Sequence, residues 1–414
     1  MENQSARIIS AGWLIDGTGD PIRRNLFLEI TQGILASIRE KREGEAVPGT
    51  VVDLSDHTLL PGLVDSHVHL CMSGTEDPLV RLRQQDFSFG EAEGVIEGHL
   101  GDHLRHGVLA VRDGGDYGGY TLRYRQERLP CRGLPMALKS AGRAWHAPGR
   151  YGRFIGRPPL EGKGLPRSIR EGHGETDHVK IVNSGLNSLT VFARETPPQF
   201  GAEDLRGAVA QASVLGLRVM VHANGREPVR LAVDAGCHSI EHGFFMGEEN
   251  LMRMRDRGTA WVPTACTMAA YARSLPRGGR ESDTAKQNLE HQIGQIARAR
   301  DLGVPVAAGT DAGSLGVHHG SSLMEEIRLL VVAGFSLEEA VQCATSQGAD
   351  LLGLGEEMGR LVPGMPATFI ALKGGPESLC GESTGLPRVF LHGRELPSGS
   401  LPERKIVDAS PELA

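Results

Sequence analysis

The sequence predicts an α/β fold, a (β/α)8 TIM-like barrel that carries a small composite β-sandwich domain. Three observations predict it. Between residues 59 and 358, strand-like apolar runs alternate with helix-like segments of 3.6-residue period, which is typical of repeated βα units around a parallel sheet. Eight such runs can be counted, which is the number that closes a barrel. Short β-rich runs bounded by turn residues lie at both ends of the chain.

The two ends of the chain are predicted to pair into one sheet domain. The first part contains the runs RIISAGWLIDG, LFLEIT, GILASIRE and VVDLSDHTLL. Near the other end, ATFIALKG and RVFLHGREL follow the turn signals Gly364 and Pro366. We therefore assign residues 1–58 together with 359–414 to the composite β domain, and residues 59–358 to the barrel.

The barrel strands follow one another at regular intervals. In chain order they are predicted at 62–69, 108–114, 135–141, 178–183, 217–223, 238–243, 260–265 and 304–311. An apolar stripe formed by Leu205, Ala208 and Ala212 indicates one of the intervening helices. The segment from about Gly142 to Asp177 breaks the alternation, since it is rich in Gly, Pro and Arg. A loop of this length inside a compact domain is usually functional or disordered.

Composition and charge limit the classes of function. The 414 residues carry 51 acidic and 44 basic side chains, a net charge of −7 without a long basic run, so we expect no nucleic-acid partner. No apolar stretch approaches the roughly 20 residues that span a bilayer, so no membrane partner is expected. Six widely spaced cysteines without a C-x-x-C pair indicate reduced thiols and a cytoplasmic location. The ligand is expected to be a small molecule, and a homo-oligomer is left open.

Side chains that bind metals occur at the ends of four predicted strands. His67 and His69 stand two residues apart, so they share one face of a strand at a spacing of about 6.6 Å. His222, His242 and Asp311 end the fifth, sixth and eighth strands. A single histidine at a strand end is more often structural than a ligand. Because active sites of such barrels form at the carboxyl ends of the strands, the five residues together predict a metal site there.

Lys180 lies inside the apolar strand 178–183. Its simplest role is an ion pair with a buried carboxylate. A buried amine, however, has a depressed pKa and is nucleophilic enough to capture carbon dioxide as a carbamate. Such a carbamate can bridge two divalent ions about 3.5–4 Å apart, the separation used by two-metal hydrolytic sites.

Five ordered segments resemble the amidohydrolase superfamily, most closely its prolidase-like branch of Xaa-Pro dipeptidases and N-acyl amino acid hydrolases with a carboxylated lysine. They are LLPGLVDSHVHL, HVKIVNSG, VMVHANG, SIEHG and AAGTDAGS, and GMPATFIAL resembles the returning strand of the family's β domain. The resemblance implies two divalent metal ions, most often Zn, with other first-row ions accepted. It implies the following ligands: His67, His69 and Asp311 for one ion, His222 and His242 for the second, and a CO2-derived carbamate on Lys180 as the bridge.

The resemblance also implies an activity, the hydrolysis of an amide bond in a dipeptide or N-acyl amino acid. A metal-bridging hydroxide would attack the carbonyl, and Asp311 would carry the proton to the leaving amine. The same centre could instead hydrolyse a lactone, a cyclic amide or a carbamate. A non-catalytic barrel is disfavoured because all six ligand positions are filled. Deamination is disfavoured because Gly225 stands where deaminases of the superfamily carry a glutamate.

The segment SAGRAWHAPGRYGRFIGRPP departs from the family, whose members often carry Gly-Gly-His-Gly there. His146, with Tyr151 behind it, is the nearest candidate to contact a substrate carbonyl. Arg143 and Arg150 flank His146 and are expected to bind a substrate carboxylate bidentately, although a solvated loop is the alternative. After Asp311, the His-Gly pair at His319 predicts a further substrate contact.

Overall fold

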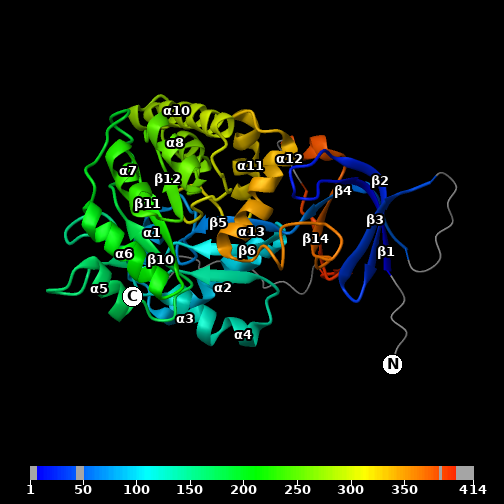
Figure 1. Ribbon diagram of the computed structural model, residues 1–414, viewed down its shortest axis with the longest axis horizontal. Coiled ribbons are helices and arrows are strands. Elements are labelled where there is room, and N and C mark those ends of the chain that lie inside the picture. The colour runs from blue at the N-terminus through cyan, green and yellow to red at the C-terminus, as the bar shows by residue number, and fades with distance from the viewer. Residues whose placement is uncertain (1–6, 43–50, 382–384, 398–414) are drawn as a thin grey trace, which may run out of the picture.

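The computed structural model describes residues 7–42, 51–381 and 385–397. Figure 1 shows an elongated molecule with a β-sheet at one end and a barrel surrounded by helices at the other. The sheet holds seven strands in the order β16-β15-β14-β4-β1-β2-β3. The strands are β1 (Arg7–Leu14), β2 (Arg23–Thr31), β3 (Ile34–Glu40), β4 (Val51–Pro61), β14 (Phe369–Lys373), β15 (Arg388–Leu391) and β16 (Arg394–Glu395).

Strands from both ends of the chain thus form one sheet, in which β14 runs antiparallel to β4 with Phe369 opposite Pro61. The sheet has a core of its own, where the rings of Phe369 and Phe390 stack with centroids 4.6 Å apart. The strand β4 continues to Pro61, and a single residue, Gly62, separates it from β5. The exact domain boundaries at 58 and 359 stay a prediction.

Seven of the predicted barrel strands form regular strands, joined by parallel pairing within two groups. They are β5 (Leu63–Val68), β6 (Val108–Asp113), β7 (Ala137–Ser140), β10 (His178–Val182), β11 (Arg218–Ala223), β12 (Ser239–His242) and β13 (Ala260–Val262). All but the ends of these strands are buried, since helices cover the outer face and side chains fill the interior.

Residues 304–312 take the place of the eighth strand, but irregularly. The amide of Ala307 donates to Trp261 O of β13 at 3.0 Å, and the amide of Asp311 donates to His67 O of β5 at 2.7 Å, so the segment joins the two edges. A side chain at Gly309 would place its Cβ 2.9 Å from the amide nitrogen of His67. Glycine therefore permits the close approach that closes the barrel on this side.

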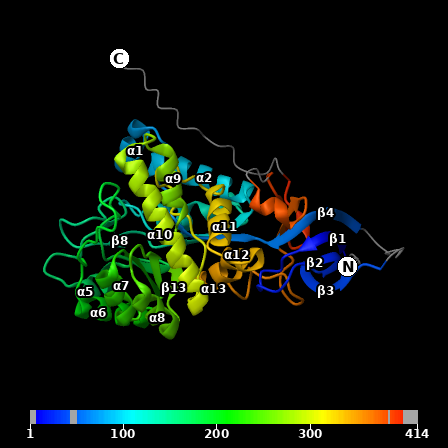
Figure 2. The same cartoon turned by 90° about the horizontal axis from the view of Figure 1, so that it is seen from above.

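The helices alternate with these strands and cover the barrel. They are α1 (Pro78–Arg83), α2 (Phe89–Arg105), α3 (Tyr120–Glu127), α4 (Leu129–Arg132), α5 (Leu165–Gly172), α6 (Ala202–Val214), α7 (Arg226–Ala235), α8 (Glu248–Arg257), α9 (Cys266–Ser274), α10 (Arg280–Leu302), α11 (Ser322–Val332), α12 (Leu337–Cys343) and α13 (Ser346–Leu352), with 3-10 turns η1 (Gln84–Asp86) and η2 (Pro376–Cys380). Figure 2 shows the long helix α10 beside α9 on the outside of the barrel.

Local sequence explains where these helices begin and which face they bury. Ser88 and Glu91 form a capping box at the start of α2, which satisfies amides that have no partner inside the helix. In α6 the predicted stripe of Leu205, Ala208 and Ala212 is the buried face. The stripe holds the helix against the barrel, because burial of apolar side chains stabilises by about 25 cal/mol per Å².

The segment 142–177 contains structure of its own. Two short strands, β8 (Ala144–Trp145) and β9 (Gly156–Arg157), pair in parallel, and α5 follows them. Trp145 of β8 lies beside Ile181 of β10. Between β7 and β10 the barrel wall is completed by a hydrogen bond from the Asp177 amide to Ser140 O at 3.0 Å.

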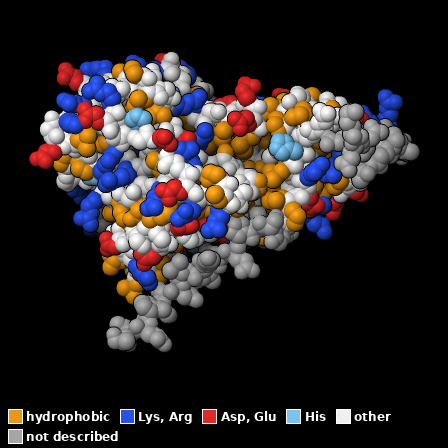
Figure 3. Space-filling model, turned by 90° about the horizontal axis from the view of Figure 1, so that it is seen from below, with side chains coloured by type: hydrophobic (Ala, Val, Ile, Leu, Met, Phe, Trp, Pro, Cys, Tyr) orange, Lys and Arg blue, Asp and Glu red, His pale blue; other side chains and the backbone are white. Residues whose placement is uncertain are grey.

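The surface carries both signs of charge. On the face in Figure 3, lysine and arginine side chains lie among aspartate and glutamate side chains. Such interspersed charge provides no single positive field for a polyanion. Among the described residues, no helix is long and apolar enough to cross a membrane.

Candidate metal centre

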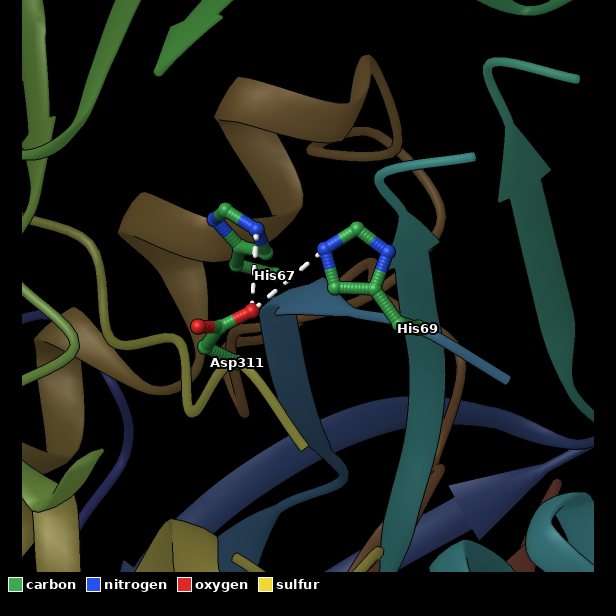
Figure 4. A group of neighbouring side chains, drawn as sticks. All are labelled: His67, His69 and Asp311. Carbon is green, nitrogen blue, oxygen red and sulfur yellow. Dashed lines mark ion pairs between the residues drawn. The ribbon is translucent and has the colours of Figure 1, made fainter. Parts of the chain in front are cut away.

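His67 and His69 at the end of β5 meet Asp311 from the irregular eighth segment (Figure 4). Asp311 Oδ1 lies 3.5 Å from Nε2 of His67 and 3.4 Å from Nε2 of His69. One ligand atom from each of the three residues lies within 4.8 Å of the others. Two imidazole nitrogens and a carboxylate oxygen that converge in this way can hold one divalent ion.

Each of these histidines has its second ring nitrogen fixed by the protein. Nδ1 of His67 donates to Glu241 Oε2 at 2.7 Å, and Nδ1 of His69 donates to the carbonyl of Gly115 at 2.9 Å. The two Nε2 atoms are therefore left as acceptors that face Asp311. Metal-binding histidines are held in the same manner in proteins.

His222 at the end of β11 and His242 at the end of β12 lie next to this group. Their ring centroids are 4.6 Å apart, and that of His242 is 5.0 Å from that of His67. Nδ1 of His242 is 2.8 Å from Thr264 Oγ1, which leaves Nε2 without a further contact among the described residues. In His222 it is Nε2 that lies 3.1 Å from the carbonyl oxygen of Gly185. Its Nδ1 is therefore the nitrogen that could bind an ion. The structure thus brings the four predicted histidines together.

Burial keeps the histidines of this group neutral. Desolvation lowers the pKa of His69 to about 4 and that of His222 to about 3, and it lowers the pKa of His67 and His242 well below the usual range. Neutral imidazole is the form that binds metals. The protonation state of the group therefore suits cations near neutral pH.

Lys180 projects from the middle of β10 into the same region and is 1% exposed. Its Nζ is buried and has no hydrogen-bond partner among the described residues. Burial lowers the pKa of the amine, and burial raises the pKa of Asp311. A buried ammonium without partners is costly, so the neutral or modified amine fits this position better.

These groups open onto one cavity. His69, Lys180, His222, His242 and Asp311 line it. The remaining wall is largely apolar or aromatic and includes Leu189, Phe244, Met268 and Tyr271. An apolar wall with a few polar groups that converge on one place is typical of a small-molecule site. Met268 and Tyr271 belong to α9, which no sequence pattern connects with the site.

The five predicted substrate contacts lie in different places. Tyr151 lines the cavity, with its ring centroid 5.4 Å from that of His222. Arg150 donates to Pro197 O at 3.1 Å from an exposed position, and Arg143 lines a different cavity. His146 is buried and bonds through Nδ1 to Ala147 O at 2.9 Å. The structure therefore places Tyr151, but neither arginine nor His146, on the wall of the metal-site cavity.

His319 is buried beside the site, and both of its nitrogens are occupied. Nδ1 lies 3.1 Å from Nε2 of His103, and Nε2 donates to Met72 O at 2.9 Å. Its ring also stacks on His99 with centroids 3.9 Å apart. This arrangement favours a packing role over contact with a ligand in the cavity.

Sequence reasoning missed Glu241 and Arg112, two charged residues inside short buried strands. Glu241 accepts from His67 through one oxygen, and its other oxygen accepts from Arg112 Nη2 at 2.9 Å. Arg112 also donates through Nε to Ser66 O at 2.7 Å. The signal that could have found them is a pair of opposite charges within strands that are otherwise apolar.

Glu241→Gln is expected to weaken metal binding by about 10- to 100-fold, because a neutral amide no longer holds the Nδ1–H of His67 with a full charge. Competition with a chromogenic chelator measures the affinity. Glu248→Gln on exposed α8 is the control, since Glu248 pairs only with Arg298 at the surface. Equal affinities of both variants and the wild type would show that Glu241 serves the fold alone.

Comparisons with known proteins agree with this geometry. Residues 58–404 match the Amidohydrolase family. Ochratoxinase of Aspergillus niger is 26% identical over 412 residues, which cover 89% of this chain and 81% of that protein. An uncharacterized protein of Mycobacterium tuberculosis is 26% identical over 349 residues, which cover 82% of this chain and 84% of that protein.

Solved structures share the fold as well. A Xaa-Pro dipeptidase with bound methionine in its active site has 26% identity and a TM-score of 0.79, and the match covers 95% of this chain and 100% of that one. Molinate hydrolase has 20% identity and a TM-score of 0.76, and the match covers 100% of this chain and 99% of that one. At this identity the likeness shows the fold alone. Because the family match extends over most of the sequence, the chain belongs to the amidohydrolase family and is a hydrolase that acts on amide bonds.

Proposed function

We propose that the protein is a binuclear metal-dependent hydrolase that cleaves the amide bond of a dipeptide or an N-acyl amino acid. The observation that carries the proposal is the convergence of four histidines, one aspartate and one buried lysine without a partner at one cavity. A Xaa-Pro dipeptidase is among the similar proteins, which supports a dipeptide as the substrate class.

The residues present fit two divalent ions. His67, His69 and Asp311 would hold one, and His222 and His242 would hold the other. Lys180 reaches the same place with a buried Nζ that no described residue satisfies, as expected of an amine that becomes a carbamate and joins both. The carbamate forms when the neutral amine attacks carbon dioxide and releases one proton. We propose zinc as the native ion, since nitrogen and carboxylate ligands suit it.

When bound, the ions would supply Lewis-acid polarisation of the scissile carbonyl and a lowered pKa of the attacking water. The protein supplies the proton transfer. Oδ2 of Asp311 accepts from Ser314 Oγ at 3.0 Å, which fixes the carboxylate so that Oδ1 faces the two histidines of β5. In this position Asp311 can take the proton of the attacking water and return it to the leaving amine.

The cavity wall supplies the binding contacts. Leu189, Phe244 and Met268 form an apolar surface that suits an acyl group or an apolar side chain. Tyr151 and Tyr271 bring hydroxyl groups to the same wall, and these can donate to a carboxylate or a carbonyl of the substrate.

Metal analysis followed by a substrate panel tests the proposal. About two equivalents of divalent ion per chain are expected after purification with added zinc, together with turnover of dipeptides or N-acyl amino acids. Loaded metal without hydrolysis of any member of either class would contradict it.

A second candidate is hydrolysis of a cyclic amide, a lactone or a carbamate by the same centre. The residues that line the metal-site cavity all lie in the described part of the chain, and apart from Lys180 they include no arginine or lysine. A substrate without a carboxylate, which needs no cationic partner, fits such a lining. An imidazolonepropionase is also among the similar proteins, at 24% identity over 384 residues.

Amidation of the substrate carboxylate separates the two candidates. If the cavity binds a free carboxylate through a charge-assisted contact of about 1.5–3 kcal/mol, then kcat/KM for the amide falls by roughly one to two decades. We expect this fall for the best dipeptide in the panel. Equal kcat/KM for the acid and its amide would favour the second candidate.

A further inference from the structure

A second cavity lies in the barrel wall, beside the place where β7 and β10 are joined by the Asp177–Ser140 hydrogen bond. It shares no lining residue with the metal-site cavity. Ala144 of β8 packs with Ile155, and Ile155 lines the metal-site cavity. Arg143 and Trp145, the residues on either side of Ala144, line the second cavity. Of the two β8 residues, only Trp145 lines a cavity, and that cavity is the second one.

Two guanidinium groups face this second cavity, and no carboxylate does. Arg143 and Arg157 both line it, and neither forms an ion pair within the described part of the chain. Each has a buried Nε without a hydrogen-bond partner among the described residues. The burial of Arg157 and, to a smaller extent, the proximity of Arg143 lower the pKa of Arg157. Two like charges in one cavity repel each other, so an anion between them would relieve an unfavourable interaction.

The guanidinium of Arg157 is held in a defined orientation. It lies over the ring of Trp145, 4.6 Å from the centroid, and it donates through Nη2 to the carbonyl of Gly172. A side chain at Gly172 would place its Cβ 2.7 Å from that nitrogen and 3.2 Å from the Trp145 ring, so glycine keeps this space open. A planar fork fixed in this way is preorganised for the two oxygens of an oxyanion.

A buried histidine also lines the cavity. His178 at the start of β10 is 4% exposed, lines the cavity, and has a buried Nε2 without a hydrogen-bond partner among the described residues. Unsatisfied buried nitrogens are rare in folded proteins. Burial lowers the pKa of His178, so its ring is neutral and adds no positive charge. The donors of the cavity are the two guanidinium groups without an ion pair, which indicates a ligand that can accept several hydrogen bonds.

We propose that this cavity binds a small oxyanion, a phosphate or carboxylate group of a small molecule, at a site separate from the metal centre. Two guanidinium groups without a neighbouring acid match a doubly charged group better than a monocarboxylate, so phosphate is the first probe. The site is independent of the proposed hydrolytic reaction and can be tested whether or not a substrate is known.

Calorimetric titration of the metal-loaded full-length protein with inorganic phosphate tests the proposal. Arg143→Gln is the informative variant, because Arg143 makes no hydrogen bond to the described residues and its removal costs the fold no such contact. We expect its affinity for phosphate to fall at least about 10-fold. Arg153→Gln, an exposed position on the same segment, is the matched control and should bind like the wild type.

Phosphate can also bind at a metal centre, so a local readout is needed. Trp145 lies in the second cavity, whereas Trp13 is in β1 and Trp261 is in β13. Phosphate is expected to change the tryptophan emission of the wild type, and the change should vanish in both Trp145→Phe and Arg143→Gln. A titration with acetate in place of phosphate distinguishes the two kinds of ligand. A similar change in emission would identify the ligand group as a monocarboxylate, and a change with phosphate alone would identify it as a dianion.

The proposal is overturned if phosphate and acetate both fail to bind, or if Arg143→Gln binds phosphate as tightly as Arg153→Gln does. An emission change that survives in Trp145→Phe and Arg143→Gln would place the anion elsewhere. None of these outcomes depends on hydrolysis, so a failure here is distinguishable from failure of the proposed function.

Discussion

Lys180→Ala is expected to lose most of its bound metal and at least about 100-fold in activity, because the variant cannot form the carbamate that we propose joins two ions. Metal content per chain after dialysis and the rate with the best substrate measure the two effects. Short carboxylates such as acetate or propionate should restore part of both, since the cavity left by the side chain can hold an anion in the place of the carbamate.

Lys286→Ala, at an exposed position of α10 paired with Asp283, is the control and should keep metal and activity. Because Lys180 is large and fully buried, Lys180→Met provides a second variant that preserves packing without the amine. Stoichiometric retention of both ions in Lys180→Ala and Lys180→Met would exclude the bridging role.

Asp311→Asn is expected to lower kcat by about 10²–10⁴-fold while the fold persists, because the amide cannot accept the proton of the attacking water. The Asn side chain still fits beside Ser314, so thermal unfolding should change little. Single-turnover rates with a metal-saturated sample separate this loss from a loss of metal.

The control is Asp283→Asn on the surface of α10, which should turn over at the wild-type rate. Near-normal turnover of metal-loaded Asp311→Asn would mean that another group moves the proton. Tyr271 would then be the next residue to substitute, since it lines the same cavity.

The barrel and the grouping of the candidate metal ligands could be predicted from the sequence because both depend on local patterns. The alternation of apolar runs with helix-like segments predicts the strands. His222 and His242 stand at the carboxyl ends of two of these strands, which is where the sites of such barrels form. The eighth strand was predicted as regular, whereas the structure shows an irregular segment. Its regularity is lost because Gly309 packs against His67 and Asp311 has a left-handed φ of 57°, which a strand pattern does not reveal.

The segment 142–177 could not be predicted in the same way. Its strands β8 and β9 are two residues long, too short for a period to be visible. Arg143 was expected near the metals because it stands three residues before His146, but β8 directs Arg143 and Trp145 to the second cavity. Neighbours in sequence within an extended segment face opposite sides, so proximity along the chain does not predict which cavity a side chain enters.

The composite sheet can be completed only late in the synthesis of the chain. β4 pairs with β14, a contact between segments roughly 300 residues apart, and β4 leads within two residues into the strand that carries His67. During synthesis the ribosome releases the barrel before β14 exists, so one edge of β4 stays unpaired until the end. A partly synthesised chain would therefore expose this unpaired edge of β4 to other molecules. Pairing with β14 removes the exposed edge.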